Sequence, residues 1–235
     1  PVFSKFAVKA NSIQSTDATL EVTLDSDGTV YYLTQKSGQA APSADTIVTS
    51  GTSIAAGQTA SEIALTGLTA KTGYTVYAVA KDLAGNTSSV QKVSFETKAD
   101  TLKVSGTLTA TGTYGVQWNN LAINASAATV TNEKGETVEG SWSWQNPSAT
   151  QPQVTTKTAV AVFTPKANPE QYNTLTANAT ITIQPKQVNN AAVELSATQV
   201  VFDGTAKQPT VVAVRDGNTV IPATEYTVSY KNNIN

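Results

Sequence analysis

The chain has 235 residues and a formal net charge of −2, and it contains no Cys, His or Met. The missing Cys and His exclude disulfide bonds, a Ser–His–Asp triad, a Cys–His dyad and the common kinds of zinc site. The small charge gives no electrostatic reason to expect nucleic acid as a partner, and no apolar run approaches the roughly 20 residues of a membrane-spanning helix. We therefore expect no metal, no cofactor and no membrane insertion.

Residues 1–99 are predicted to form a first β-sandwich. The stretch ATLEVTL (18–24) alternates so that its large apolar residues share one face of a strand. A second strand is predicted at YTVYAVAK (74–81), followed by the loop DLAGN (82–86), in which Gly85 suits a left-handed conformation. Short strands separated by Gly, Asn and Asp turns are typical of a β-sandwich.

Within this module, LTGLTAKTGYTV (65–76) resembles the fibronectin type III pattern Leu-x-Pro-x-Thr-x-Tyr, with Leu68, Thr72 and Tyr74 in the matching places. Ala70 stands where the family usually has Pro. The resemblance implies that Leu68 and Tyr74 are structural. Tyr74 is then a corner tyrosine whose hydroxyl bonds to the backbone near the preceding turn.

Residues 100–185 are predicted to form a second β-rich module, reached through a linker at KADTLK (98–103). VQWNNLAI (116–123) is interpreted as one of its β segments, and NEKG (132–135) as a hairpin turn. GSWSW and the following VFTPKANPEQYNTL (162–175) resemble a repeat common in bacterial surface proteins. That repeat shows Gly-x-Trp-x-Trp, then Phe-x-Pro and an Asn–Tyr pair, whose order is reversed here as Tyr172–Asn173.

Residues 186–235 resemble another repeat, one found in large bacterial adhesins, with Tyr-Asp-Gly, Pro-x-Val and Asp-Tyr-x-Val motifs. Pro209 and Val211 match this pattern, whereas Phe202–Asp203–Gly204 replaces the Tyr form and Glu225–Tyr226 substitutes for Asp–Tyr. The resemblance implies an immunoglobulin-like sandwich, which takes about 100 residues. We therefore expect this third module to be truncated at its C-terminus, with an unpaired sheet edge.

The aromatic residues allow two interpretations. Trp142 and Trp144 alternate with Ser141 and Ser143, which is typical of a half-buried strand with the indoles in the core. Alternatively, four aromatic residues form a surface on which carbohydrate rings stack: Trp118, Trp142, Trp144 and Tyr172. The core interpretation is favoured for the strand tryptophans, whereas Trp118 is as readily partly exposed as buried.

The acidic residues are interpreted as structural or solvated. Asp25 and Asp27 are spaced as at the start of a calcium loop, but Lys36 stands at position 12, where an EF-hand needs a bidentate Glu. The DSDG stretch is therefore predicted to be a turn. Three glutamates near the NEKG turn are read as surface charges and not as a glycosidase pair: Glu133, Glu136 and Glu139.

These observations predict an all-β protein of tandem antiparallel β-sandwich modules, arranged as a rod. The expected function is that of a non-catalytic, monomeric spacer in an extracellular bacterial surface protein, attached or secreted, which projects or connects other domains. Any carbohydrate or host ligand would then be bound through neighbouring domains. The alternatives are a carbohydrate-binding or adhesive module, and an accessory region of a large secreted glycoside hydrolase. An intramolecular Lys–Asn isopeptide bond, which needs a buried Lys, also stays open.

Overall fold

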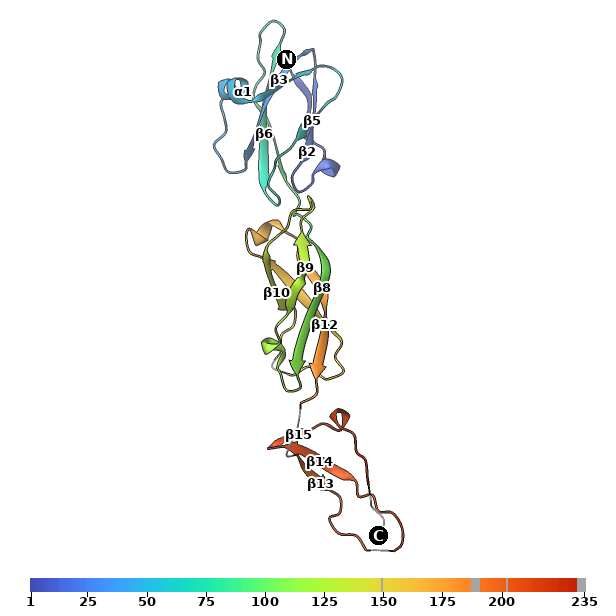
Figure 1. The fold of residues 1–235 in the computed structure, drawn as a ribbon. Helices are drawn as coiled ribbons and strands as arrows, with labels where there is room; N and C mark the ends of the chain where they lie inside the picture. The colour runs from blue at the N-terminus through green and yellow to red at the C-terminus, as the bar shows by residue number, and fades with distance from the viewer. Residues whose placement is uncertain (149, 187–190, 202, 232–235) are drawn as a thin grey trace. The chain divides into compact units, whose positions relative to one another are not determined.

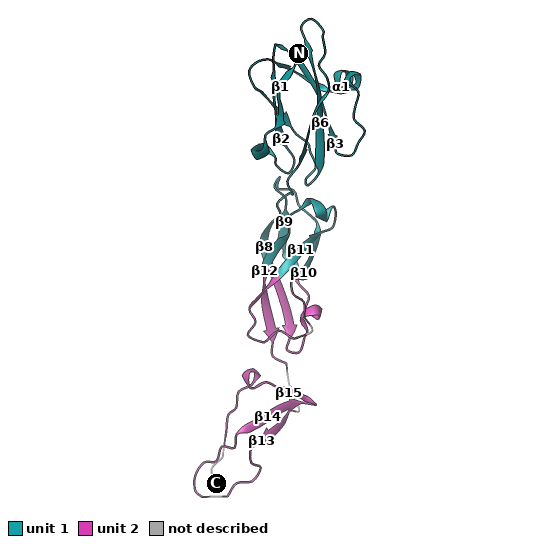
Figure 2. Cartoon of the chain, turned by 180° about the vertical axis from the view of Figure 1, so that it is seen from behind, with its two compact units in different colours: residues 1–107, 125–143, 161–177 teal, residues 108–124, 144–160, 178–235 magenta. Residues whose placement is uncertain are grey.

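A computed structural model describes residues 1–148, 150–186, 191–201 and 203–231. The fold is mostly β, with several antiparallel sheets and one parallel strand pair, and divides into two compact units (Figure 2). The first unit comprises residues 1–107, 125–143 and 161–177, and the second comprises residues 108–124, 144–160 and 178–235. No helix in the described part of the chain is long and apolar enough to span a membrane.

Two antiparallel sheets form a β-sandwich in the N-terminal part of the first unit (Figure 1). One sheet has the order β1-β2-β5, with β1 at Phe3–Val8, β2 at Ala18–Leu24 and β5 at Ser61–Leu65. The other has the order β4-β3-β6-β7, with β4 at Thr52–Ala56, β3 at Gly28–Lys36, β6 at Gly73–Asp82 and β7 at Gln91–Glu96.

The core of this sandwich lies between the two sheets. Alternate residues of β2 are buried, among them Leu20, Val22 and Leu24, so the predicted strand and its inward face are confirmed. Val76 of β6 is also fully buried in the same cluster. The predicted DLAGN loop follows β6, and Gly85 has the expected positive φ, of 89°.

A short helix, α1 (Ala44–Ser50), covers the outer face of β3 and β6. Ser43 caps it, because its hydroxyl oxygen accepts the Thr46 N–H at 3.1 Å. Ile47 is fully buried against Tyr77 and Val79. β6 is therefore buried on both faces, and the segment between β3 and β4 adds a third layer that the sequence reading did not predict.

A five-stranded sheet has the order β10-β11-β12-β8-β9. Each of its strands contributes residues to both units: β8 (Lys103–Thr113), β9 (Asn124–Thr131), β10 (Gly140–Trp144), β11 (Thr158–Pro165) and β12 (Leu175–Gln184). β8 and β12 pair in parallel, with Ala179 opposite Leu108. The NEKG turn is confirmed, since Asn132 and Gly135 close it with a 3.0 Å backbone hydrogen bond.

The interpretation of residues 116–123 as a β segment is wrong. Trp118–Asn120 form a 3₁₀ helix, η2, in which the Asn120 N–H donates to Gln117 O at 3.0 Å. Two consecutive Asn residues favour turns, because their side chains bond to nearby backbone and compete with a strand ladder. Other 3₁₀ helices lie at Ala10–Ser12 (η1), Pro169–Gln171 (η3) and Ala223–Glu225 (η4).

The C-terminal part of the second unit carries a three-stranded antiparallel sheet, β13-β14-β15. β13 spans Ala192–Leu195, β14 spans Val211–Asp216 and β15 spans Thr219–Ile221. Ala213 and Val214 of β14 are buried, whereas Val193 and Val212 are more than half exposed. This sheet therefore buries much less of its apolar surface than the sandwich of the first unit does.

Candidate functional site

β10 carries the two strand tryptophans and alternates in burial. Trp144 is 8% exposed and Trp142 is partly buried, while Ser141 and Ser143 between and beside them are exposed. Both indoles thus lie on the inward side of the strand, and the serines face solvent. This placement favours the core interpretation over a flat stacking surface built by both tryptophans.

Trp142 packs into an apolar cluster in the first unit. Its ring centroid lies 5.2 Å from that of Phe163, at an interplanar angle of 55°. The cluster is built on buried Leu102, Val130 and Phe163, and Tyr172 packs against it as well. Two of the four proposed stacking residues, Trp142 and Tyr172, are therefore used to cover a core.

Gly140, the first residue of the GSWSW motif, is required by the same packing. A Cβ atom at this position would lie 2.4 Å from Phe163 Cζ and 2.4 Å from the Thr164 carbonyl oxygen. The backbone oxygen has little freedom to move, because Thr164 lies within β11. Gly140 of the GSWSW motif and Phe163 of the Phe-x-Pro motif are thus in close contact with each other.

Trp118 and Trp144 form a separate pair in the second unit. Their ring centroids are 5.3 Å apart and the rings cross at 75°, an edge-to-face arrangement. The Trp144 Nε1–H donates to the Leu121 carbonyl at 2.7 Å, which satisfies the buried indole. Trp118 stays partly exposed beside it. The four predicted aromatics therefore belong to two separate packing groups, Trp142 and Tyr172 in one and Trp118 and Trp144 in the other.

The segment 98–103, predicted as a linker, is held by hydrogen bonds within the first unit. Asp100 is only 6% exposed. Its N–H donates to Gln171 O at 2.8 Å, and its own carbonyl accepts the Asn173 N–H at 2.9 Å. Nearer the sandwich, the Lys98 N–H donates to Gln14 O at 3.1 Å. The segment is therefore attached at Lys98 and at Asp100.

Side chains extend this network to the NEKG turn. The Asp100 carboxylate accepts the Glu133 N–H at 3.1 Å, and the Glu133 carboxylate accepts the Ser15 hydroxyl at 2.7 Å. The interpretation of Glu133 as merely a solvated charge is therefore incomplete. We call the three residues Ser15, Asp100 and Glu133 the junction network.

The pKa values of Glu133 and of the nearby Tyr172 depart from their ordinary values. The Ser15 hydroxyl, and after it Thr101, hold the pKa of Glu133 below its ordinary value, because hydrogen bonds to the ionised carboxylate favour it. Burial, and then the charges of Asp100 and Glu136, raise the pKa of Tyr172. Both shifts favour the charge states these residues ordinarily have near neutral pH, with Glu133 ionised and Tyr172 neutral.

The corner tyrosine makes the backbone contact expected at its position. The Tyr74 hydroxyl oxygen accepts the Thr69 N–H at 2.9 Å, and Tyr74 is 6% exposed. Its ring stacks on Phe95, with centroids 5.9 Å apart. Leu68 packs against the main core of the sandwich, so both residues contribute to packing.

The acidic and basic residues build no further site in the described residues. Asp25 accepts the Val2 N–H at 2.8 Å, and this hydrogen bond lowers the pKa of the Asp25 carboxyl. No group of three acidic side chains in the described ranges is arranged to hold a metal ion. No Lys among the described residues is buried, which leaves the isopeptide hypothesis without the buried amine that it needs.

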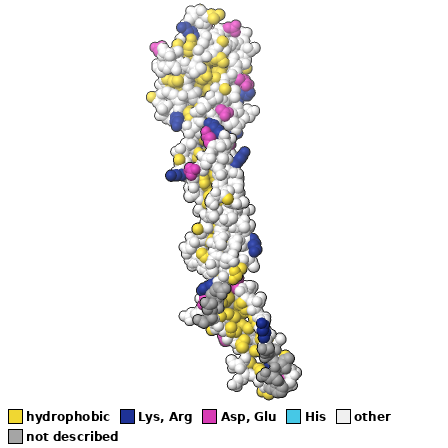
Figure 3. Space-filling view, viewed as in Figure 1, with side chains coloured by type: hydrophobic (Ala, Val, Ile, Leu, Met, Phe, Trp, Pro, Cys, Tyr) yellow, Lys and Arg dark blue, Asp and Glu magenta, His cyan; other side chains and the backbone are white. Residues whose placement is uncertain are grey.

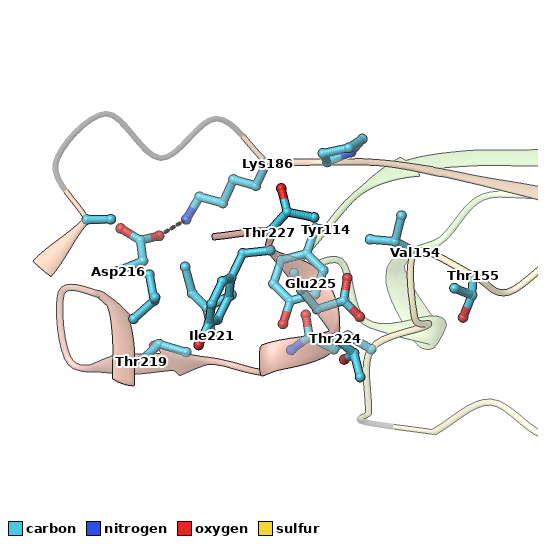
Figure 4. A pocket seen from close by; sticks show the side chains of 16 residues that line it. Tyr114, Val154, Thr155, Lys186, Asp216, Thr219, Ile221, Thr224, Glu225 and Thr227 are labelled. Atoms are coloured by element: carbon cyan, nitrogen blue, oxygen red, sulfur yellow. Dashed lines mark hydrogen bonds and ion pairs between the residues drawn. The ribbon is translucent and has the colours of Figure 1, made fainter. Parts of the chain in front are cut away.

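A cavity of about 780 Å³ lies in the second unit (Figure 4). Tyr114, Lys186, Asp216 and Glu225 lie on its wall. The Lys186 ammonium group is paired with the Asp216 carboxylate, as the dashed line in Figure 4 marks. The positive charge of Lys186 is thus already neutralised by Asp216. We assign no ligand to this cavity.

Sequence reasoning missed the junction network. Its residues lie at positions that are unremarkable in sequence: a Ser before the strand at 18–24, an Asp in a predicted linker and a Glu in a turn. The one available signal was Asp100 itself, an acidic residue between Ala99 and Thr101, next to the apolar Leu102 that enters the core.

No protein-family model matches this chain, and no curated protein matches it in sequence.

Proposed function

We propose that this chain is a non-catalytic spacer of an extracellular bacterial surface protein, which connects or projects other domains. The observation that carries the proposal is the junction network. A spacer must transmit position along the chain, and a free linker does not do so. In segment 98–103, by contrast, the N–H and the carbonyl of Asp100 are both hydrogen-bonded.

The two sheets of the N-terminal sandwich support the fibronectin type III resemblance on which the proposal draws. That family shares the two-sheet sandwich architecture. The corner contact between Tyr74 and the Thr69 N–H lies where the resemblance places it. These features support a structural role for the module at residues 1–99.

The composition of the surface also supports the proposal. Only 14% of the residues are charged, and the charged side chains are sparse and scattered on the face drawn in Figure 3. Such a surface offers no strong field to steer a charged ligand. The absence of His and Cys removes the commonest catalytic bases and nucleophiles.

In this proposal the three modules at 1–99, 100–185 and 186–235 follow one another end to end, as a monomeric rod. Small-angle X-ray scattering of the chain in dilute solution tests it. We expect a distance distribution with a single early peak, set by the module width, and a long tail. A symmetric distribution typical of a compact particle would overturn the rod, and a mass twice that of the chain would overturn the monomer.

A further inference from the structure

A shallow pocket of the second unit lies beside the pair of tryptophans. It has a volume of about 150 Å³ and is lined by Trp118, Trp144, Gln145, Asn146, Ala159 and Val160. We propose that this pocket, here named the Trp118 pocket, binds one pyranose ring of a neutral carbohydrate. The inference goes beyond the spacer role and does not depend on it.

The aromatic part of the Trp118 pocket is fixed in place. Trp144 is held by its hydrogen bond to the Leu121 carbonyl, and its indole meets that of Trp118 at 75°. The backbone of Trp118 is held in turn, since its N–H donates to Thr150 O at 3.2 Å. The two rings therefore form a corner that is ordered before any ligand enters, which lowers the entropic cost of binding.

Trp118 also has a free polar group. Its Nε1–H has no hydrogen-bond acceptor among the described residues, in contrast to that of Trp144. A partly exposed indole with an unused donor combines an apolar face with a polar edge. These are the two features that a sugar needs, because a pyranose ring has an apolar C–H face and hydroxyls around its rim.

Two amide side chains complete the polar part of the pocket. Gln145 and Asn146 are exposed, and neither amide group has a partner in the described part of the chain. The Gln145 backbone is nevertheless fixed, because its N–H donates to Val160 O at 3.0 Å. An amide both donates and accepts hydrogen bonds, as does a hydroxyl, so two amides match the rim of a sugar.

The lining selects against other ligands. It contains no charged side chain, which disfavours anions and cations. A cavity of about 150 Å³ accepts a six-membered ring, so one sugar unit fits. A proline-rich peptide also binds aromatic surfaces, but it needs a groove for successive residues, and the Trp118 pocket is bounded by Ala159 and Val160.

The three tryptophans of the chain provide the test. In a ¹⁵N-labelled sample each indole N–H gives one signal, assigned by single Trp→Phe variants. We expect methyl glycosides of neutral hexoses, or N-acetylglucosamine, to shift the Trp118 signal in a saturable way. The Kd should be on the order of 1 mM, because one ring buries little area. The Trp142 signal, from an indole packed on Phe163, should stay unchanged.

A double variant separates binding from folding. Gln145→Ala with Asn146→Ala removes exposed amides only, and should raise the Kd for the sugar about tenfold, as the loss of one or two hydrogen bonds predicts. Gln117→Ala, at an exposed amide next to Trp118 but outside the pocket lining, is the matched control and should bind as the unchanged chain does.

Three results would overturn the inference. The first is that no neutral sugar of the panel moves the Trp118 signal. The second is that the double variant binds as tightly as Gln117→Ala, and the third is that sugars move the Trp142 and Trp118 signals alike. Decaproline serves as the competing probe, and a shift of Trp118 with decaproline and with no sugar would assign the pocket to a peptide instead.

Discussion

The hydroxyl of Ser15 donates a 2.7 Å hydrogen bond to the carboxylate of Glu133, 118 residues further along the chain. Ser15 is 5% exposed and lies just before β2, whereas Glu133 lies in the turn after β9. Through the Glu133 N–H the contact continues to Asp100. Three segments that are distant in sequence are thus tied together at one place, which is the basis of the proposed spacer role.

Replacing Ser15 by Ala should loosen the junction network. The substitution removes the donor to a carboxylate and should lower the free energy of unfolding by about 1 kcal/mol, the usual net value of one hydrogen bond. Thermal unfolding followed by circular dichroism measures the effect. Ser53→Ala, at an exposed position of β4, is the control. An equal melting temperature for the two variants would show that the contact contributes nothing.

The stability supplied by Glu133 should depend on pH. Because hydrogen bonds lower the pKa of this carboxyl in the folded protein, its contribution is present above the ordinary pKa of Glu and is lost as the pH falls through the lowered value. The unchanged chain should therefore melt higher than Glu133→Gln at pH 7, by an amount equivalent to at most about 1 kcal/mol for so exposed a group.

This difference in melting temperature should vanish towards acid pH. Comparing the two proteins at each pH matters, since Asp25, Asp82 and Asp203 also have lowered pKa values and reduce the stability of both proteins alike. A difference that stays constant from pH 7 to the acid limit would contradict the assignment of the shift to Glu133.

Tyr74→Phe should destabilise the N-terminal sandwich. The substitution keeps the ring on Phe95 but leaves the Thr69 N–H without its acceptor, at a cost of about 1–2 kcal/mol. Tyr31→Phe is the control, because it removes the same hydroxyl at a position beside α1, away from the contact with Thr69. In urea unfolding, Tyr74→Phe should have a lower midpoint than Tyr31→Phe. Equal midpoints would show that the hydrogen bond between Tyr74 and the Thr69 N–H does not stabilise the sandwich.

Gly140→Ala should cost more than an ordinary exchange in a strand. The new Cβ would overlap Phe163 Cζ and the Thr164 carbonyl, each at 2.4 Å, and overpacking of this kind costs about 1–3 kcal/mol. Unfolding followed by tryptophan fluorescence, to which the neighbouring Trp142 contributes, measures the effect. Ser143→Ala, exposed on the same strand, should be nearly neutral, and a Gly140→Ala chain as stable as this control would contradict the packing.

Local periodicity predicted the strands because their burial alternates. The pattern of β2 and that of β10 could both be read from apolar residues at every second position. Periodicity says nothing about partners, so the parallel pairing of β8 with β12 could not be predicted. The same holds for Ser15 and Glu133, whose contact depends on how separately formed elements meet.

The candidate sites show the same limit. The repeat of Trp at alternate positions placed Trp142 and Trp144 on one side of a strand, but it could not say that each indole would meet a different aromatic partner. α1 was missed because seven residues with one buried apolar side chain, Ile47, leave no helical periodicity to detect.

The distance between spin labels on either side of segment 98–103 tests the central claim most directly. The chain contains no Cys, so spin labels react only with cysteines that are introduced. Suitable positions are Lys92→Cys on β7 and Thr164→Cys on β11, which are both exposed. A fixed junction predicts a narrow, single-peaked distance distribution that broadens when Asp100→Ala removes the acceptor of the Glu133 N–H. A broad distribution in the chain with Asp100 intact, no narrower than that of the variant, would contradict the account.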